Sequence, residues 1–179
     1  MISNKSGFLR RFARDEDGQM LVEFALAIPL IFTIFLTSIE LGIYSMRQMF
    51  LDRGLDMAVR EIRLGTGENI THDEVKDSIC AFSGFLPDCS ATLRLEMRPV
   101  DPRNFANGFN ASADCVDVSQ PIEPLQQFVH GNNHELMILR ACYMFLPVFP
   151  QTGLGYEFAK DGSGRSFMYA MSAFVQEPS

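Results

Sequence analysis

The sequence lacks the motifs of several common enzyme classes, and it has fewer basic than acidic residues. Acidic residues outnumber basic ones by 22 to 15, so no basic patch is expected to neutralise phosphates, and a nucleic-acid role is disfavoured. The patterns G-x-S-x-G and H-E-x-x-H are absent, as is a Gly-rich loop that opens a helix with Lys. We therefore expect no enzymatic activity and no cofactor.

Metal-binding patterns are also scarce. His130 and His134 form H-x3-H, but the intervening Gly-Asn-Asn makes a helix improbable and favours a solvated loop. His72 is expected at a helix start with no third ligand beside it. No C-x-x-C pair occurs, so the sequence predicts no metal site.

What the chain does have is one apolar run near its start. The 16 residues from Phe24 to Ile39 carry no charge, and a helix from Gln19 to Glu40 would rise ~31 Å, the thickness of a bilayer core. Glu40 is expected at the outer interface, within reach of water. Glu23 lies inside the run, where a charge costs ~2.5 kcal/mol or more, and is by default a functional candidate.

Cleavage after Gly18 would compensate this charge. Gln19 would become the first residue, and its amino group would lie within one helical turn of the Glu23 carboxylate, which also meets the positive end of the helix dipole. The positions that carry this pattern are Gly18, Gln19, Glu23 and Phe24, followed by Ala25 and Pro29.

Gly followed by Glu and an aromatic at this spacing matches the cleavage motif of type IV prepilins. The whole stretch resembles the TadE-like pseudopilins, the TadE/TadF/TadG group of tight-adherence (Flp) pilus systems, and the ending Gln176-Glu177-Pro178 is similar to theirs. The resemblance implies a minor pseudopilin of the bacterial inner membrane that is processed by a prepilin peptidase. Its implied partners are other pseudopilins, the Flp major pilin, the inner-membrane pilus platform proteins and membrane lipid.

The basic residues before the run predict the orientation. Lys5, Arg10, Arg11 and Arg14 keep the N-terminus in the cytoplasm, which places the rest of the chain in the periplasm. We expect a cleaved leader at 1–18, a long helix at 19–64 with its membrane span at about 21–43, and an extracytoplasmic domain at 65–179. An ordinary secretory signal, cleaved near the small residues Thr37, Ser38 and Gly42, is the alternative.

Beyond the run the apolar residues become periodic, which predicts an amphipathic continuation of the helix that stops at Gly65. The stripe consists of Leu41, Tyr44, Leu51, Leu55, Ala58 and Ile62. We expect this half to pack on a small antiparallel sheet, giving a pilin-like α+β fold.

The remaining elements follow from local signals. A capping box at Thr71 and Glu74 predicts a helix from His72 to about Phe82. Alternation predicts a strand at 92–98, and apolar stretches predict strands at 136–149 and 166–175, separated by a Gly-rich loop at 150–164. A long loop is expected at 101–120 and a short helix at 121–129.

All four cysteines lie beyond the apolar run, on the side where disulfides persist. Four cysteines allow three pairings, among which sequence does not decide. We favour Cys80 with Cys89, closing a Gly-Pro turn, and Cys115 with Cys142, tying the long loop to a strand.

Two other functions remain open. One is a periplasmic enzyme or binding domain held by an uncleaved signal anchor, which reduced, metal-binding cysteines or a deep polar pocket would favour. The other is a minor pseudopilin of a type II secretion system. Those leaders tend to have a basic residue before the glycine and Thr before the Glu, whereas this chain has Asp17 and Val22.

Overall fold

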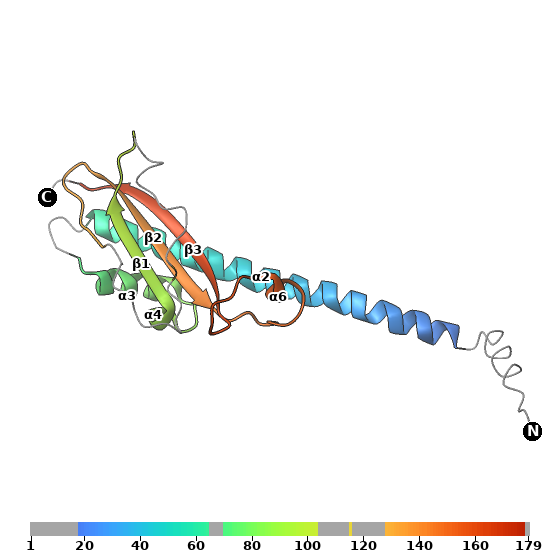
Figure 1. The fold of residues 1–179 in the computed structure, drawn as a ribbon. Helices are drawn as coiled ribbons and strands as arrows, with labels where there is room; N and C mark the ends of the chain where they lie inside the picture. The colour runs from blue at the N-terminus through green and yellow to red at the C-terminus, as the bar shows by residue number, and fades with distance from the viewer. Residues whose placement is uncertain (1–17, 65–69, 104–114, 116–127, 178–179) are drawn as a thin grey trace, which may run out of the picture.

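In the computed structural model the chain forms one very long helix with a small α+β domain on its second half (Figure 1). The structure describes residues 18–64, 70–103, 115 and 128–177. The leader at 1–17, most of the predicted loop at 101–120 and nearly all of the predicted helix at 121–129 lie outside these residues. The predicted α+β class is confirmed.

Helix α2 runs from Gln19 to Leu64 without interruption, as predicted. Its 46 residues give a length of ~69 Å. Pro29 lies inside it and removes one backbone donor. The second half packs on the domain through Leu51, Leu55, Ala58 and Ile62, whereas the first half extends away from it (Figure 1).

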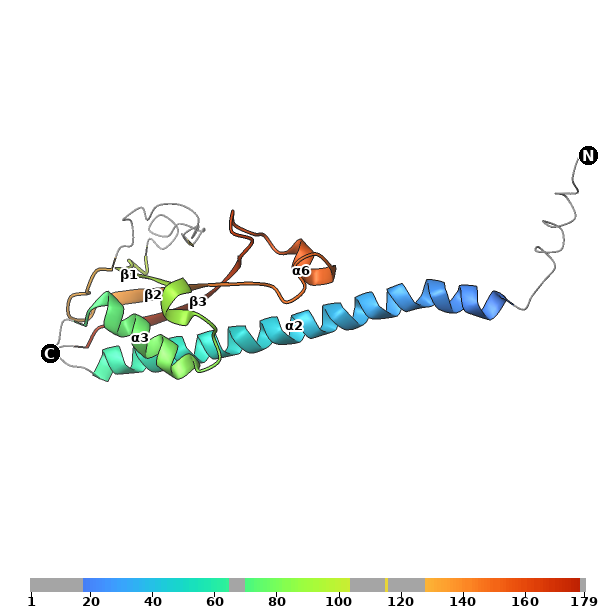
Figure 2. The same ribbon diagram turned by 90° about the horizontal axis from the view of Figure 1, so that it is seen from below.

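The sheet has three antiparallel strands in the order β1-β2-β3, with bounds Leu93–Pro99, Leu136–Phe145 and Ser166–Val175. Leu95 pairs with Ala141, and Ala141 with Ala170, so these three residues share the inner face. Helices α2 and α3 cover that face, and Figure 2 shows the sheet lying above α2. The core lies between these two layers.

Helix α3, His72–Ser83, begins with the predicted capping box. The Glu74 carboxylate accepts the Thr71 amide at 2.7 Å, and the Glu74 amide donates to the Thr71 hydroxyl. Helix α3 ends at Gly84, whose φ of 54° suits glycine.

The close approach of α3 to α2 occurs at Gly54, which is buried. A methyl group at this position would lie 2.7 Å from the Ile79 carbonyl oxygen and would overlap the Ser83 hydroxyl. Only glycine therefore lets the two helix backbones come this near.

Three local predictions were wrong. The second predicted strand ends at Phe145 rather than at residue 149, because the backbone at Val148 and Phe149 bonds to a side chain of α2 instead of a neighbouring strand. Two short helices were missed: α4, Cys89–Thr92, and α6, Gly153–Glu157, which interrupts the predicted Gly-rich loop.

Candidate functional site

The first half of α2 exposes large apolar side chains around its whole circumference. Met20 is 81% exposed, Leu26 74% and Phe32 58%. The helix is long and apolar enough to cross a membrane, and none of its most apolar stretch is buried in the domain. It is therefore a candidate membrane anchor.

The hydroxyl groups of this half are already satisfied. Thr33 donates to the Pro29 carbonyl at 2.7 Å, Thr37 to the Thr33 carbonyl at 2.7 Å, and Ser38 to the Ile34 carbonyl at 2.8 Å. Hydroxyls bonded four residues back need no water partner, which is the arrangement an apolar solvent requires.

The predicted cleavage motif lies at the free end of this helix. Gly18 precedes the first helical residue, and its carbonyl accepts the Val22 amide at 3.2 Å. Gln19 donates through Nε2 to the Glu23 carboxylate at 2.9 Å. Phe24 is 66% exposed. The Gly18–Gln19 bond therefore stands at the start of the helix, with Glu23 one turn away and hydrogen-bonded to residue 19.

Glu40 corrects a prediction. It was expected to reach water at the end of the span, yet it is only 1% exposed. Its Oε1 accepts the Val148 amide at 3.0 Å and its Oε2 accepts the Phe149 amide at 2.9 Å. Both oxygens of this buried carboxylate are hydrogen-bonded to backbone N–H groups, so the charge is compensated. The contact joins the exposed half of α2 to the loop after β2.

The sequence contained a signal for the burial of Glu40, although not for its partners. Glu40 lies four residues before Tyr44, so it continues the buried stripe, whereas Leu41 does not. The prediction that Leu41 belongs to the stripe was wrong, since Leu41 is 53% exposed. The prediction that Glu40 reaches water was based on its charge. Its position on the helix instead faces the domain.

The same loop also contacts α2 one turn closer to its start. Helix α6 packs beside α2 (Figure 2). A side chain at Gly153 would lie 3.5 Å from the Cβ of Thr37 and would overlap its hydroxyl. Phe158, just past α6, stacks on Tyr44 with ring centroids 5.3 Å apart. The domain therefore reaches along α2 as far as Thr37.

The domain is closed by two disulfides, Cys80–Cys89 and Cys115–Cys142, the pairs that the sequence analysis favours. The first closes the turn after α3. Tyr143 donates its hydroxyl to the Pro87 carbonyl within that turn at 2.7 Å, and burial raises the pKa of Tyr143. The second attaches Cys115 to β2.

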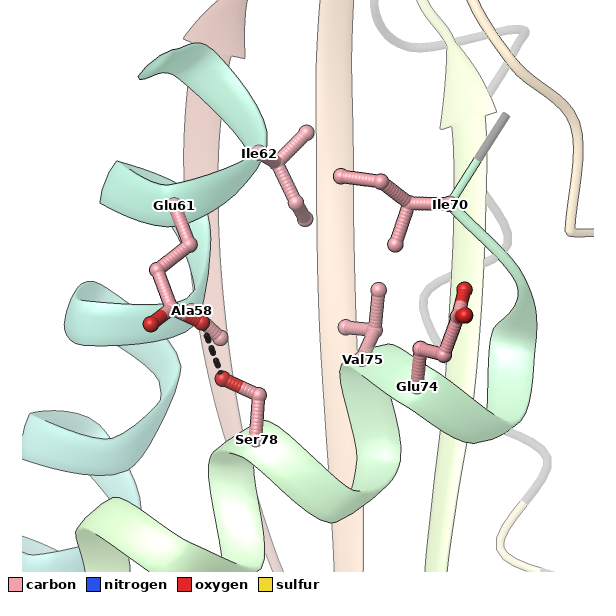
Figure 3. A pocket seen from close by; sticks show the side chains of 7 residues that line it. All are labelled: Ala58, Glu61, Ile62, Ile70, Glu74, Val75 and Ser78. Atoms are coloured by element: carbon pink, nitrogen blue, oxygen red, sulfur yellow. Dashed lines mark hydrogen bonds between the residues drawn. The ribbon is translucent and has the colours of Figure 1, made fainter. Parts of the chain in front are cut away.

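A groove of about 510 Å³ lies between α2 and α3. Figure 3 shows Ile62, Ile70 and Val75 pointing toward one another across it. Both carboxylates that line it are hydrogen-bonded within the domain. Glu61 accepts the Ser78 hydroxyl, and Glu74 accepts the Thr71 amide in the capping box. No histidine, lysine or cysteine is among the described residues that line it.

The histidines serve local contacts. His72 bonds to Asp73 at 3.0 Å, and His130 Nε2 lies 2.8 Å from the Ile70 carbonyl oxygen. Within the described ranges, no three His, Cys, Asp or Glu side chains are grouped so that they could hold a metal ion.

The fold and this junction define a class of protein: a candidate single-helix membrane anchor that continues as the core helix of a small disulfide-bonded α+β domain. Residues 18–60 match the family model described as TadE-like protein. The predicted resemblance is thus confirmed over the anchor and the first part of the packed helix. No curated protein and no solved structure matches the chain.

Proposed function

We propose that this chain is an inner-membrane-anchored minor pseudopilin that takes part in assembling a Flp-type (tight-adherence) pilus. The TadE-like match supports the association with a Tad pilus system. In this proposal the exposed half of α2 spans the membrane with the N-terminus in the cytoplasm, and the domain lies in the periplasm. The role is structural, and the partners are other pseudopilins, the major pilin, the platform proteins and lipid.

The observation that carries the proposal is the position of the motif. Gly18 and Glu23 stand at the free end of an exposed apolar helix that belongs to the core of the domain at its other end. A prepilin peptidase that cleaves after Gly18 removes the leader and leaves this helix whole. The new amino group of Gln19 then lies near the Glu23 carboxylate, to which the Gln19 side-chain amide already donates a hydrogen bond.

The alternative secretory signal conflicts with the packing of α2. Cleavage between Thr37 and Gly42 would cut the helix in its middle and separate the anchor from the domain. A cut after Gly42 would also remove Glu40, the acceptor of two backbone amides.

The test is the N-terminus of the mature protein. The full chain is expressed with an active Tad prepilin peptidase and, as the control, with an inactive one, and membrane-extracted protein is examined by intact-mass and N-terminal analysis. We expect a start at Gln19 or its cyclised form only with the active peptidase. A start at Met1 in both strains, or a start beyond Ser38, would refute the proposal.

A further inference from the structure

We propose that the loop between β2 and β3, residues 146–165, rests in the headgroup region of the membrane and holds the domain against the bilayer. The inference deepens the proposed function, since it requires that α2 spans the membrane. The surface concerned consists of Leu146, Val148 and Tyr156, and its partner is lipid.

The first support is the level at which this loop meets α2. Thr37, the residue against which Gly153 packs, lies 18 residues after Gln19, a rise of ~27 Å. A bilayer core is ~30 Å thick. A span that begins as early as Gln19 therefore ends near Thr37, at the level of the loop.

A later start of the span strengthens this argument. If Glu23 marks the cytoplasmic edge of the hydrocarbon, ~30 Å of helix ends near Ile43, beyond both Thr37 and Glu40. Tilting of the helix lowers the loop further toward the bilayer. In the first case the segment bonded to Glu40 lies at the interface, and in the second it lies ~5 Å inside the hydrocarbon edge, so in neither case does it lie in bulk water.

The second support is the chemistry of the exposed surface. Leu146 is 55% exposed, Val148 44% and Tyr156 66%. The Lys160 ammonium lies 5.6 Å from the Tyr156 ring centroid and donates to the Tyr156 carbonyl at 3.0 Å. Tyrosine and lysine beside aliphatic residues are typical of segments at the membrane–water interface.

The loop's charges do not oppose this location. Glu157 and Asp161 are balanced in number by Lys160 and Arg165. Asp161 is used within the loop, where it accepts the amides of Ser163 at 3.0 Å and Arg165 at 2.8 Å. Binding therefore depends on apolar and aromatic contact, and a neutral lipid is sufficient.

The third support is that hydrogen bonds from α2 fix the loop independently of any contact with lipid. Glu40 binds the Val148 and Phe149 amides, and Arg47 donates to the Leu146 carbonyl at 3.2 Å. The loop contacts α2 at Glu40 and Thr37, next to the exposed apolar half of the helix, which itself requires an apolar surrounding. The bilayer that receives the helix is thus the partner that meets the loop.

The test uses tryptophan as a depth probe, because the chain contains none of its own. Three single variants of the full chain are reconstituted in phosphatidylcholine vesicles with brominated lipids. The bromine is near the headgroup end of the acyl chain in one series and near the middle of the bilayer in a second series, which reports on the span. Tyr156→Trp reports on the loop and Phe32→Trp on the span. Tyr169→Trp is the matched control, because Tyr169 is 57% exposed and pairs with Cys142, three residues or ~10 Å along β2 from the strand's end at Phe145, where the loop starts.

We expect bromine to quench the Tyr156→Trp and Phe32→Trp variants and to leave the emission of Tyr169→Trp unchanged. Quenching of Phe32→Trp alone would overturn the membrane contact of the loop and leave the anchor intact. Equal quenching of all three would overturn it as well, because the whole domain would then lie on the lipid. No quenching in any variant would refute the span, and with it the proposed function.

Discussion

The Glu40 carboxylate accepts the backbone amide of Val148 at 3.0 Å across 108 positions of the chain. Its second oxygen accepts the next amide, that of Phe149. One side chain of α2 therefore fixes the start of the β2–β3 loop.

Replacing Glu40 should release this loop. Glu40→Ala leaves two part-buried amides without their partner, at up to about 1–3 kcal/mol each, whereas Glu40→Gln keeps one acceptor oxygen and should lose less. Urea unfolding of the detergent-solubilised chain and proteolysis of the loop measure the effect. Asp56→Ala, an exposed carboxylate of the same helix, is the control. Equal stability of Glu40→Ala and the control would contradict the role of Glu40.

Glu23→Ala should leave membrane insertion intact and sharply reduce pilus assembly. Removal of the carboxylate makes insertion easier by ~2.5 kcal/mol, so lost function does not follow from a poorer span. Membrane abundance, processing at Gly18 and surface pili are measured in one strain, with Glu23→Gln separating charge from shape. Normal processing together with normal pili would count against the motif role of Glu23.

Gly54→Ala should destabilise the domain by about 1–3 kcal/mol, because the added methyl overpacks the contact with Ile79. Gly42→Ala is the matched control on the same helix, since nothing lies within 4 Å of its added methyl. Alanine is the better helix former by ~1 kcal/mol, so this control should be neutral or stabilising. Thermal unfolding of both variants measures the difference in stability. A Gly54→Ala protein as stable as the wild type would refute the close approach of the two helices.

The disulfides should contribute unequally. The Cys115–Cys142 bridge spans 27 positions and the Cys80–Cys89 bridge 9, for which loop-closure entropy gives about 3.5 and about 2.6 kcal/mol. Non-reducing peptide mapping first establishes the pairs, and denaturant unfolding of the two double Cys→Ser variants then compares them. A bridge between Cys89 and Cys115 would show the pairing to be wrong.

Acid should weaken the start of α3 through Glu74. The Thr71 amide lowers the pKa of Glu74 below its ordinary value of 4.5, so the carboxylate stabilises the fold above that pH and stops doing so as the pH falls through the folded pKa. Glu74→Gln keeps an acceptor oxygen without a charge. The Tm advantage of the wild type at neutral pH should therefore shrink below pH 4.5. An unchanged Tm difference would contradict this assignment. Asp73, whose pKa is lowered by its hydrogen bond to His72, is present in both proteins and cancels in the comparison.

Local signals explain which parts of this structure could be predicted. The bounds of α2 and the capping box of α3 follow from apolar runs and cap residues that are neighbours in sequence. The Glu40 contact depends on a loop more than a hundred positions away, and no periodicity encodes such a partner. Gly54 was missed for a similar reason, because a glycine at a helix crossing has meaning only once the second helix is placed.

The continuity of α2 has a mechanical consequence. A helix of 46 residues without a break has no hinge between its exposed apolar half and the half in the core. Glu40 and α6 add a second attachment beside the helix axis, which resists rotation of the domain about that axis. An axial pull of one helical turn should therefore lift the sheet by about the same 5.4 Å, and a torque on the anchor should turn the domain with it.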